Sequence, residues 1–195
     1  MTAIRRNHQY RQIDERIVKS YIKLASTMDT SKIGVVELCR AAKVNRSTFY
    51  NHYKGTWEIR NKITDGIIRG IDEIFDSFDY KTFYEEPEKI FNQINIRVND
   101  HIEYLRSLLM VTNAEYFVQH LLKSLWEKTL TNDKNGFPEH IRNSAIGQIN
   151  SAYFIAGIIN VYCGYISGRL QCSSDDITKI LSKTIKYTQS EEFLK

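Results

Sequence analysis

The sequence predicts an all-α protein, and three observations support that fold class. Only two prolines, Pro87 and Pro138, occur in 195 residues, so long helices meet few breaks. Apolar residues recur at steps of three and four along most of the chain, which is the period of an amphipathic helix. No useful length of chain alternates apolar with polar residues, as a half-buried strand would. The composition, 42% apolar and 26% charged, is typical of a folded globular protein and argues against disorder.

The first third of the chain predicts one long helix followed by two short ones. Apolar residues from Ile13 to Met28 define an amphipathic helix of about four turns, which ends at residues 29–31. A short segment rich in small apolar residues covers 35–42, and a second runs from Arg46 to Tyr53. Two short helices joined by a three- or four-residue turn and packed on a preceding helix form a helix-turn-helix.

The middle of the chain predicts three longer helices. Apolar stripes predict helices over 57–79, 87–109 and 113–130. The stretch 80–86 is expected to be a connector, and Pro87 stands where the first turn of a helix tolerates proline.

The C-terminal part predicts the longest helix and a short terminal one. A polar loop at 131–136 precedes a helix over about 138–170, which is apolar on two faces and is therefore expected to be buried on two sides. Ser173 and Asp176 form a capping pair that begins a helix over 174–188. The whole chain is expected to contain eight or so helices.

Positive charge is concentrated near the N-terminus. Residues 1–60 contain 12 Lys or Arg and 5 Asp or Glu, whereas the remaining residues contain 15 and 18, and the net charge of the chain is +4. A basic module on a slightly acidic body indicates binding to a polyanion such as nucleic acid. An ordinary solvated surface is the alternative that charge alone leaves open.

Residues 45–56 carry the chemistry of a DNA-reading helix. Asn45 is a good N-cap, and the first turn after it displays Arg46 and two hydroxyl side chains, which hydrogen-bond to phosphates or base edges. Phe49 and Tyr53, four residues apart, are expected to point into the core. Lys54 stands next to the following helix N-terminus, where a phosphate oxygen binds readily. A plain pair of surface helices is the alternative interpretation.

The same stretch resembles a known family, the tetracycline-repressor (TetR) family of bacterial transcription regulators. The similarity covers roughly residues 14–59, and the chain length and the apolar Ala156-Gly157 segment are similar to a Gram-positive subgroup with a compact C-terminal domain. The resemblance implies a helix-turn-helix DNA-binding domain over 1–56 and a helical ligand-binding and dimerisation domain over 57–195. It is carried by three runs: Leu38-Cys39-Arg40-Ala41-Ala42, Val44-Asn45-Arg46-Ser47-Thr48-Phe49-Tyr50 and His52-Tyr53-Lys54.

The resemblance also implies roles for single residues. The residues matching Tyr50 and His52 bind phosphates, and those matching Arg46 and Asn51 lie closer to bases. Three positions depart from the family pattern: Thr56 stands where a phosphate-binding lysine is common, Lys43 where glycine is common, and Gly34 where a Ser or Thr cap is usual. The arm from Arg5 to Arg11 is expected to add minor-groove or phosphate contacts, or else to be a disordered basic tail. The candidate DNA-binding residues are Val35, Asn45, Arg46, Ser47, Thr48, Tyr50, Asn51, His52, Lys54 and Thr56.

The rest of the chain is expected to form the dimer interface and to bind a small-molecule inducer. One short helix reads too few base pairs, so two copies about 34 Å apart are expected on a palindrome. The helices 138–170 and 174–188 are the interface candidates, unless the longer one is central to one protomer's core. A small-molecule inducer is expected between helix 57–79 and the helices that follow it. The candidate ligand-binding residues are Arg97, His101, Tyr104, Tyr116, His120 and Tyr153.

The sequence therefore predicts a cytoplasmic, homodimeric repressor that a small-molecule inducer releases from a palindromic operator in double-stranded DNA. The alternative is an adaptor whose helical body binds a protein partner.

No HExxH, GxGxxG, GxxxxGK[ST] or GxSxG motif occurs, so no enzyme activity, metal or cofactor is expected. Three cysteines without CxxC spacing predict free thiols in a reducing compartment, although Cys163 and Cys172 leave a redox pair open. The basic N-terminus and the absence of a run of about 18 apolar residues predict neither export nor a membrane span.

Overall fold

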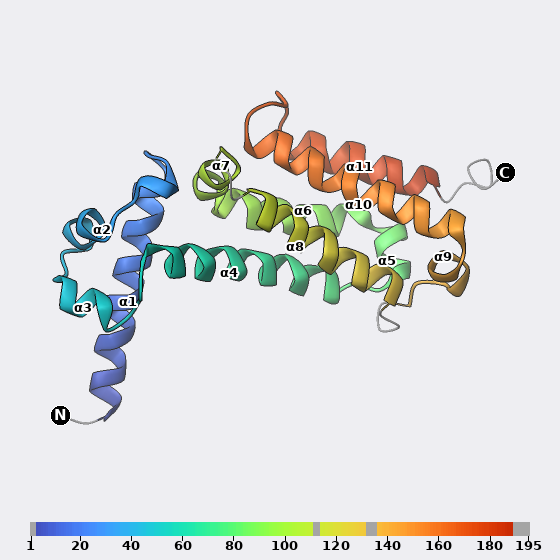
Figure 1. Ribbon diagram of the computed structural model, residues 1–195. Helices are drawn as coiled ribbons and strands as arrows, with labels where there is room; N and C mark the ends of the chain where they lie inside the picture. Colours follow the sequence, from blue (N-terminus) through green and yellow to red (C-terminus); the bar gives the residue numbers. More distant parts are fainter. Residues whose placement is uncertain (1–2, 111–113, 132–135, 189–195) are drawn as a thin grey trace. The chain divides into compact units, whose positions relative to one another are not determined.

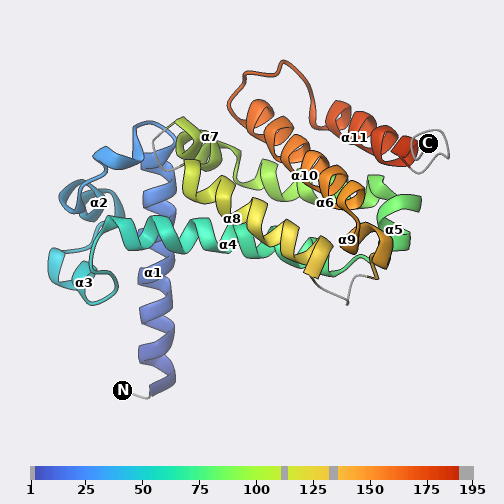
Figure 2. The ribbon, with the colours of Figure 1, turned by 45° about the vertical axis from the view of Figure 1, so that its right-hand side comes forward.

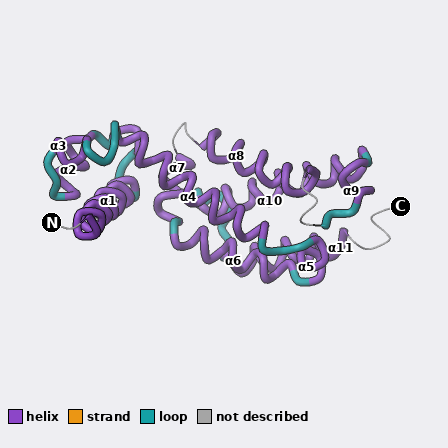
Figure 3. The backbone as a smooth tube through the Cα atoms, turned by 90° about the horizontal axis from the view of Figure 1, so that it is seen from below, coloured by secondary structure: helices purple, strands orange, loops and turns teal. Residues whose placement is uncertain are grey.

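A computed structural model describes residues 3–110, 114–131 and 136–188 (Figure 1). Over these residues the chain consists of helices and loops and contains no strand, as the purple and teal tube of Figure 3 shows, so the all-α prediction is confirmed. The chain forms two compact units. The first comprises Met1–Gly66 with Glu103–Thr112, and the second comprises Ile67–Ile102 with Asn113–Lys195.

The first unit is built on its N-terminal helix. α1 packs against α2, and α2 packs against α3 (Figure 1). Its buried core includes Ile17 and Tyr21 from α1, Leu38 from α2 and Phe49 from α3. The predicted basic arm is part of α1, which begins at Ala3, and the side chains of Arg5 and Arg6 lie outside the described part of the structure. The elements are α1 (Ala3–Ala25), the short 3₁₀ helix η1 (Thr30–Lys32), α2 (Val35–Ala42), α3 (Arg46–Tyr50), the first part of α4 (Thr56–Asp76), and α7 (Ile102–Met110).

A three-residue turn sets the direction of α3. Lys43 adopts a left-handed backbone conformation with φ 51° and ψ 47°, and its N–H bonds back to the Arg40 carbonyl. The Asn45 side chain then accepts a hydrogen bond of 2.6 Å from the Thr48 N–H, which confirms the predicted N-cap. α2 begins at Gly34 without any side-chain cap. The turn therefore depends on one strained lysine and one capping asparagine.

The second unit packs its helices around a buried polar centre. α11 lies along α6, and α10 packs against α8, α9 and α11 (Figures 1 and 2). The Asn95 amide of α6 donates to the Ser174 carbonyl at 2.9 Å and to the Thr178 hydroxyl at 2.8 Å, and it accepts from the Tyr162 hydroxyl at 2.8 Å. Further elements are α5 (Tyr80–Glu85), α6 (Pro87–Asp100), α8 (Ala114–Trp126), the short π-helix η2 (Glu127–Thr131), α9 (Glu139–Asn143), α10 (Ala145–Ile166) and α11 (Ser174–Thr188).

Three predicted element boundaries are wrong, and local side-chain caps explain two of them. The expected connector at 80–86 is helix α5, because the Asp79 carboxylate accepts from the Thr82 N–H at 2.8 Å and starts a helix. The expected helix 87–109 breaks at His101, which leaves the helical region with φ −123° and ψ 14°. The expected helix 138–170 breaks at Ser144, whose extended backbone and hydroxyl cap α10, and α10 ends at Ile166. The terminal helix lies where it was predicted, with Ser173 and Asp176 bonded to each other.

One face of α10 is apolar and uncovered in the single chain. Ile146, Ile149 and Tyr153 are 70%, 68% and 74% exposed, whereas Ile155 and Ile159 on the other side are buried. The predicted burial of α10 on two sides is therefore not met within one chain. Among the described helices, α10 alone is long and apolar enough to cross a membrane, by length and composition only. A helix that packs inside a protein in solution passes the same test, so this observation is weak evidence for a span.

Replacing Lys43 by glycine is expected to stabilise the chain. Glycine adopts the left-handed conformation without the Cβ clash, so Lys43→Gly should raise the free energy of unfolding by about 1 kcal/mol. Urea unfolding followed by circular dichroism measures the change. Lys43→Ala is the matched control, since it removes the same charge and keeps the Cβ. An equal gain in both variants would show that charge, and not backbone strain, is responsible.

Candidate nucleic-acid interface

Helix α3 has one buried edge and one exposed face. Phe49 is fully buried, and Tyr53, just beyond the helix, is 5% exposed. Arg46, Ser47 and Tyr50 lie on the opposite side and are exposed. Side chains of this kind donate hydrogen bonds to phosphates and base edges. Burial of Phe49 and Tyr53 therefore fixes the side of α3 that carries these hydrogen-bond donors.

The predicted DNA-binding residues divide into three groups. The exposed ones surround α3 and, with the exposed cations Arg40 and Lys43, form a basic surface that we call the α3 face. Val35, Thr48 and Thr56 are half-buried, and His52 is covered. The exposed predicted residues are Asn45, Arg46, Ser47, Tyr50, Asn51 and Lys54.

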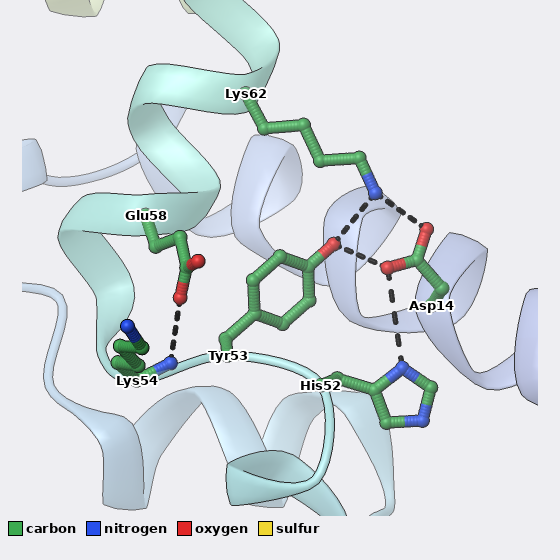
Figure 4. A network of polar contacts seen from close by, with 6 residues as sticks. All are labelled: Asp14, His52, Tyr53, Lys54, Glu58 and Lys62. Carbon is green, nitrogen blue, oxygen red and sulfur yellow. Dashed lines mark hydrogen bonds and ion pairs between the residues drawn. The ribbon is translucent and has the colours of Figure 1, made fainter.

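Lys54 lies at the start of α4, where the backbone is already capped. The Lys54 N–H donates to the Glu58 carboxylate at 2.7 Å, as Figure 4 shows. Glu58 thereby occupies a backbone amide next to the helix N-terminus where a phosphate oxygen was expected. The Lys54 side chain remains exposed next to that turn, so its ammonium is the group available to an anion.

A polar network ties the segment after α3 to α1 and α4. The Tyr53 hydroxyl donates to the Asp14 carboxylate, and the Lys62 ammonium donates to Asp14 at 2.7 Å and to the Tyr53 hydroxyl at 3.0 Å (Figure 4). Because these three residues come from three segments, the network fixes the position of the α3 face relative to α1 and the first turns of α4. Hydrogen bonds to charged groups are among the stronger ones in proteins.

The network changes the protonation of its members. Burial raises the pKa of Asp14, but hydrogen bonds from Lys62 and Tyr53 outweigh it and hold the pKa below its ordinary value. Burial, followed by the bond to Asp14, raises the pKa of Tyr53 to about 12. The carboxylate is therefore charged and the phenol neutral at neutral pH, which is the arrangement the hydrogen bonds require.

His52 is placed differently from what the resemblance implies. Its side chain is 3% exposed, and its ring stacks on Tyr10 at a centroid distance of 3.9 Å. Its Nδ1 lies 4.0 Å from the Asp14 carboxylate (Figure 4). Burial lowers the pKa of His52, so the ring is neutral near neutral pH. The imidazole thus contacts α1 and is not offered to a phosphate in this conformation.

The predicted ligand-binding residues have different surroundings. Tyr104 is buried in the first unit, where its hydroxyl shares a hydrogen bond of 2.9 Å with the Thr64 hydroxyl. Arg97 of the second unit lies against Gly70, where an added Cβ would meet its guanidinium. His101 ends α6, and burial lowers its pKa. The other three, Tyr116, His120 and Tyr153, are exposed.

Sequence reasoning missed the support of the site. Tyr10, Asp14 and Lys62 were not among its candidates, although they hold the segment that follows α3. Asp14 and Tyr53 are 39 residues apart, so no spacing connects them. One signal was available in the sequence: Tyr53 is expected to point into the core, and a buried tyrosine hydroxyl needs a hydrogen-bond partner.

Other site types find little support in the described part of the chain. No group of three or more His, Cys, Asp or Glu side chains there could hold a metal ion. Cys39, Cys163 and Cys172 are free thiols, and burial raises the pKa of Cys39 and of Cys163. No protein-family model matches the chain, and comparison with curated proteins finds no match.

Removing the Asp14 carboxylate is expected to destabilise the first unit in a pH-dependent way. Since the folded-state pKa is lowered, the carboxylate stabilises the fold above its ordinary pKa of 3.8, and this contribution is lost as the pH falls through the lowered value. Asp14→Asn should cost about 1–2 kcal/mol near neutral pH. Urea unfolding at about pH 6 and about pH 3 measures the difference, which should shrink at the lower pH.

Glu15→Gln is the control for that experiment. Glu15 is the exposed neighbour of Asp14 on α1, and its carboxylate bonds to no described residue. If Glu15→Gln lowered the free energy of unfolding as much as Asp14→Asn, the effect would come from the general charge of α1. That result would contradict the network.

Proposed function

We propose that the chain is a homodimeric transcription regulator that binds a palindromic operator through the α3 face. The observation that carries the proposal is the presentation of Arg46, Ser47, Tyr50 and Asn51 on the exposed side of a short, anchored helix. A second helix that follows a short turn and displays donors on its first turns enters the major groove in helix-turn-helix proteins. The resemblance of residues 14–59 to TetR-family regulators supports the same interpretation.

Charge supports nucleic acid as the partner of this face. Lys43 and Lys54 flank α3, Arg40 lies on the preceding helix, and all three are exposed. Cations at the border of a reading helix bind backbone phosphates and fix its register, whereas donors at its centre read bases. We assign Arg46 and Asn51 to bases and Tyr50 and Lys54 to phosphates. His52, which stacks on Tyr10, is assigned a supporting role.

The exposed apolar face of α10 supports dimerisation. It carries Ile146, Ile149 and Tyr153, and α11 adds the exposed Ile180 and Tyr187. Large apolar side chains exposed along one helix face are typical of a protein–protein interaction site. Two copies that pair through α10 and α11 would form a four-helix arrangement and place two α3 faces on one palindrome. A small molecule that favours a dimer with another spacing would release the DNA.

An adaptor that binds a protein partner through the same α10 face is the alternative. Selection of the full-length chain against random double-stranded DNA, followed by sequencing, separates the two functions. Enrichment of one palindromic sequence is the result we expect. Failure to enrich any palindrome would contradict the regulator and favour the adaptor.

Two substitutions on the α3 face are expected to differ in kind. Arg46→Ala should weaken binding to the selected palindrome by about 1–3 kcal/mol and relax the preference at one base pair. Lys54→Ala should weaken binding to all sequences alike and reduce the slope of log affinity against log salt by about one. Fluorescence anisotropy over a salt series measures both. Identical behaviour of the two variants would overturn the division into base and phosphate contacts.

One substitution on α10 is expected to separate the dimer. Ile149→Asp places a charge on the proposed interface, where burying it without a partner is costly, so sedimentation velocity should show a monomer. Ile96→Asp is the matched control, because Ile96 is 64% exposed on α6, outside the proposed interface. A dimer that survives Ile149→Asp, or is lost equally in Ile96→Asp, would exclude α10 as the interface.

A further inference from the structure

The second unit contains a cavity surrounded by aromatic rings. It measures about 70 Å³ and lies between the end of α4, α5, α6, the α8–η2 segment, α10 and α11. None of the six polar residues predicted to bind a ligand lines it. The lining rings are those of Phe75, Phe78, Phe83, Tyr84, Phe137 and Phe154.

The charged groups of the cavity lining are already engaged. Lys128 forms an ion pair with Asp76, and its side chain is only 16% exposed. Asp79 uses its carboxylate to cap α5, through the hydrogen bond from the Thr82 N–H. A charged ligand would have to break one of these interactions and lose its own hydration inside an apolar space. The lining therefore favours an uncharged ligand.

Three hydroxyl-bearing residues of the lining are not engaged. The hydroxyls of Tyr84, Thr129 and Ser151 bond to no other group in the described part of the chain. Burial raises the pKa of Tyr84 to about 12, so its phenol stays protonated and able to donate. Polar groups placed among apolar rings give a small-molecule site its specificity, because each needs a partner once water is displaced.

We propose that this cavity binds a single-ring, uncharged aromatic molecule that carries a hydroxyl group. The rings of Phe83 and Phe137 would pack edge-on or tilted against the ligand ring, as they already do with neighbouring rings in the cluster. The hydroxyl would exchange hydrogen bonds with Thr129 and Ser151. A single ring is the largest ligand that the space could take, because a cavity of about 150 Å³ in another protein core accepts benzene and this cavity of about 70 Å³ would have to widen on binding.

In the proposed regulator this cavity would be the inducer site, so the inference rests in that respect on the proposed function. Binding itself can be measured without DNA. Phenol, toluene and benzoate are the probes, because they share one ring and differ in the hydroxyl and the charge. Isothermal titration of the full-length chain should show saturable binding of phenol, with toluene and benzoate at least about tenfold weaker.

Two variants locate the phenol site. Ser151→Ala and Thr129→Val should each weaken phenol binding about three- to tenfold and leave toluene binding unchanged. Ser20→Ala is the control, since Ser20 belongs to α1 in the first unit and does not line the cavity. Unchanged circular dichroism and urea midpoints establish that the variants are folded.

Each other outcome overturns a stated part of the proposal. No saturable phenol binding, or equal binding by all variants, would exclude the cavity as the site. Toluene binding as tight as phenol would exclude the role of the hydroxyls, and benzoate binding tightest would assign recognition to Lys128. Phenol that binds but leaves affinity for the selected palindrome unchanged would exclude the inducer role. Failure of the DNA selection would reject the proposed function and leave the titration result standing.

Discussion

The position of α3 depends on the anchoring of its ends, because the helix is too short to be stable by itself. A helix of five residues falls far below the length at which isolated helices persist in water. The Asn45 cap fixes its first turn, and buried Phe49 and Tyr53 fix the side away from solvent. The Tyr53 hydroxyl, through Asp14 and Lys62, then connects the chain after α3 to two longer helices. Whatever the exposed side of α3 binds, its geometry follows from this anchoring.

The sides of helix α10 face different surroundings, and the residues on each side differ accordingly. Ser151 and Phe154 line the cavity, Tyr162 donates to the buried Asn95, and Ile149 belongs to the uncovered apolar face. A helix that is apolar on most sides is normally surrounded by other helices. Polar bonds to Asn95 specify its packing against α6 and α11, since a shift along either neighbour would leave the buried amide without partners. Packing within the single chain accounts for the other sides of α10 but leaves this apolar face exposed.

The sequence predicted those features that depend on neighbours along the chain. The all-α class, the Asn45 cap and the start of the terminal helix at Ser173 follow from periodicity and local hydrogen bonds, and all three are confirmed. The breaks at His101 and Ser144 were missed because apolar periodicity continues across them, and only the backbone shows that the helix stops. The Asp14–Tyr53–Lys62 network and the aromatic cavity join residues that are far apart in sequence. No single-sequence pattern records such contacts, which arise when amphipathic helices pack.

Helix α4 has residues in both compact units, and through it a ligand bound in the proposed cavity would have a route to the α3 face. Its first turns carry Lys62, which bonds to Tyr53, and its end carries Phe75, which lines the cavity. A ligand changes an affinity elsewhere only by binding two conformations unequally. Displacement of the Phe75 ring would favour positions of α4 that suit the ligand, and the Lys62 bond would transmit any shift of α4 to the segment that anchors α3. Residues of both proposed sites thus belong to one helix, and any coupling between them would depend on how firmly each end of α4 is held.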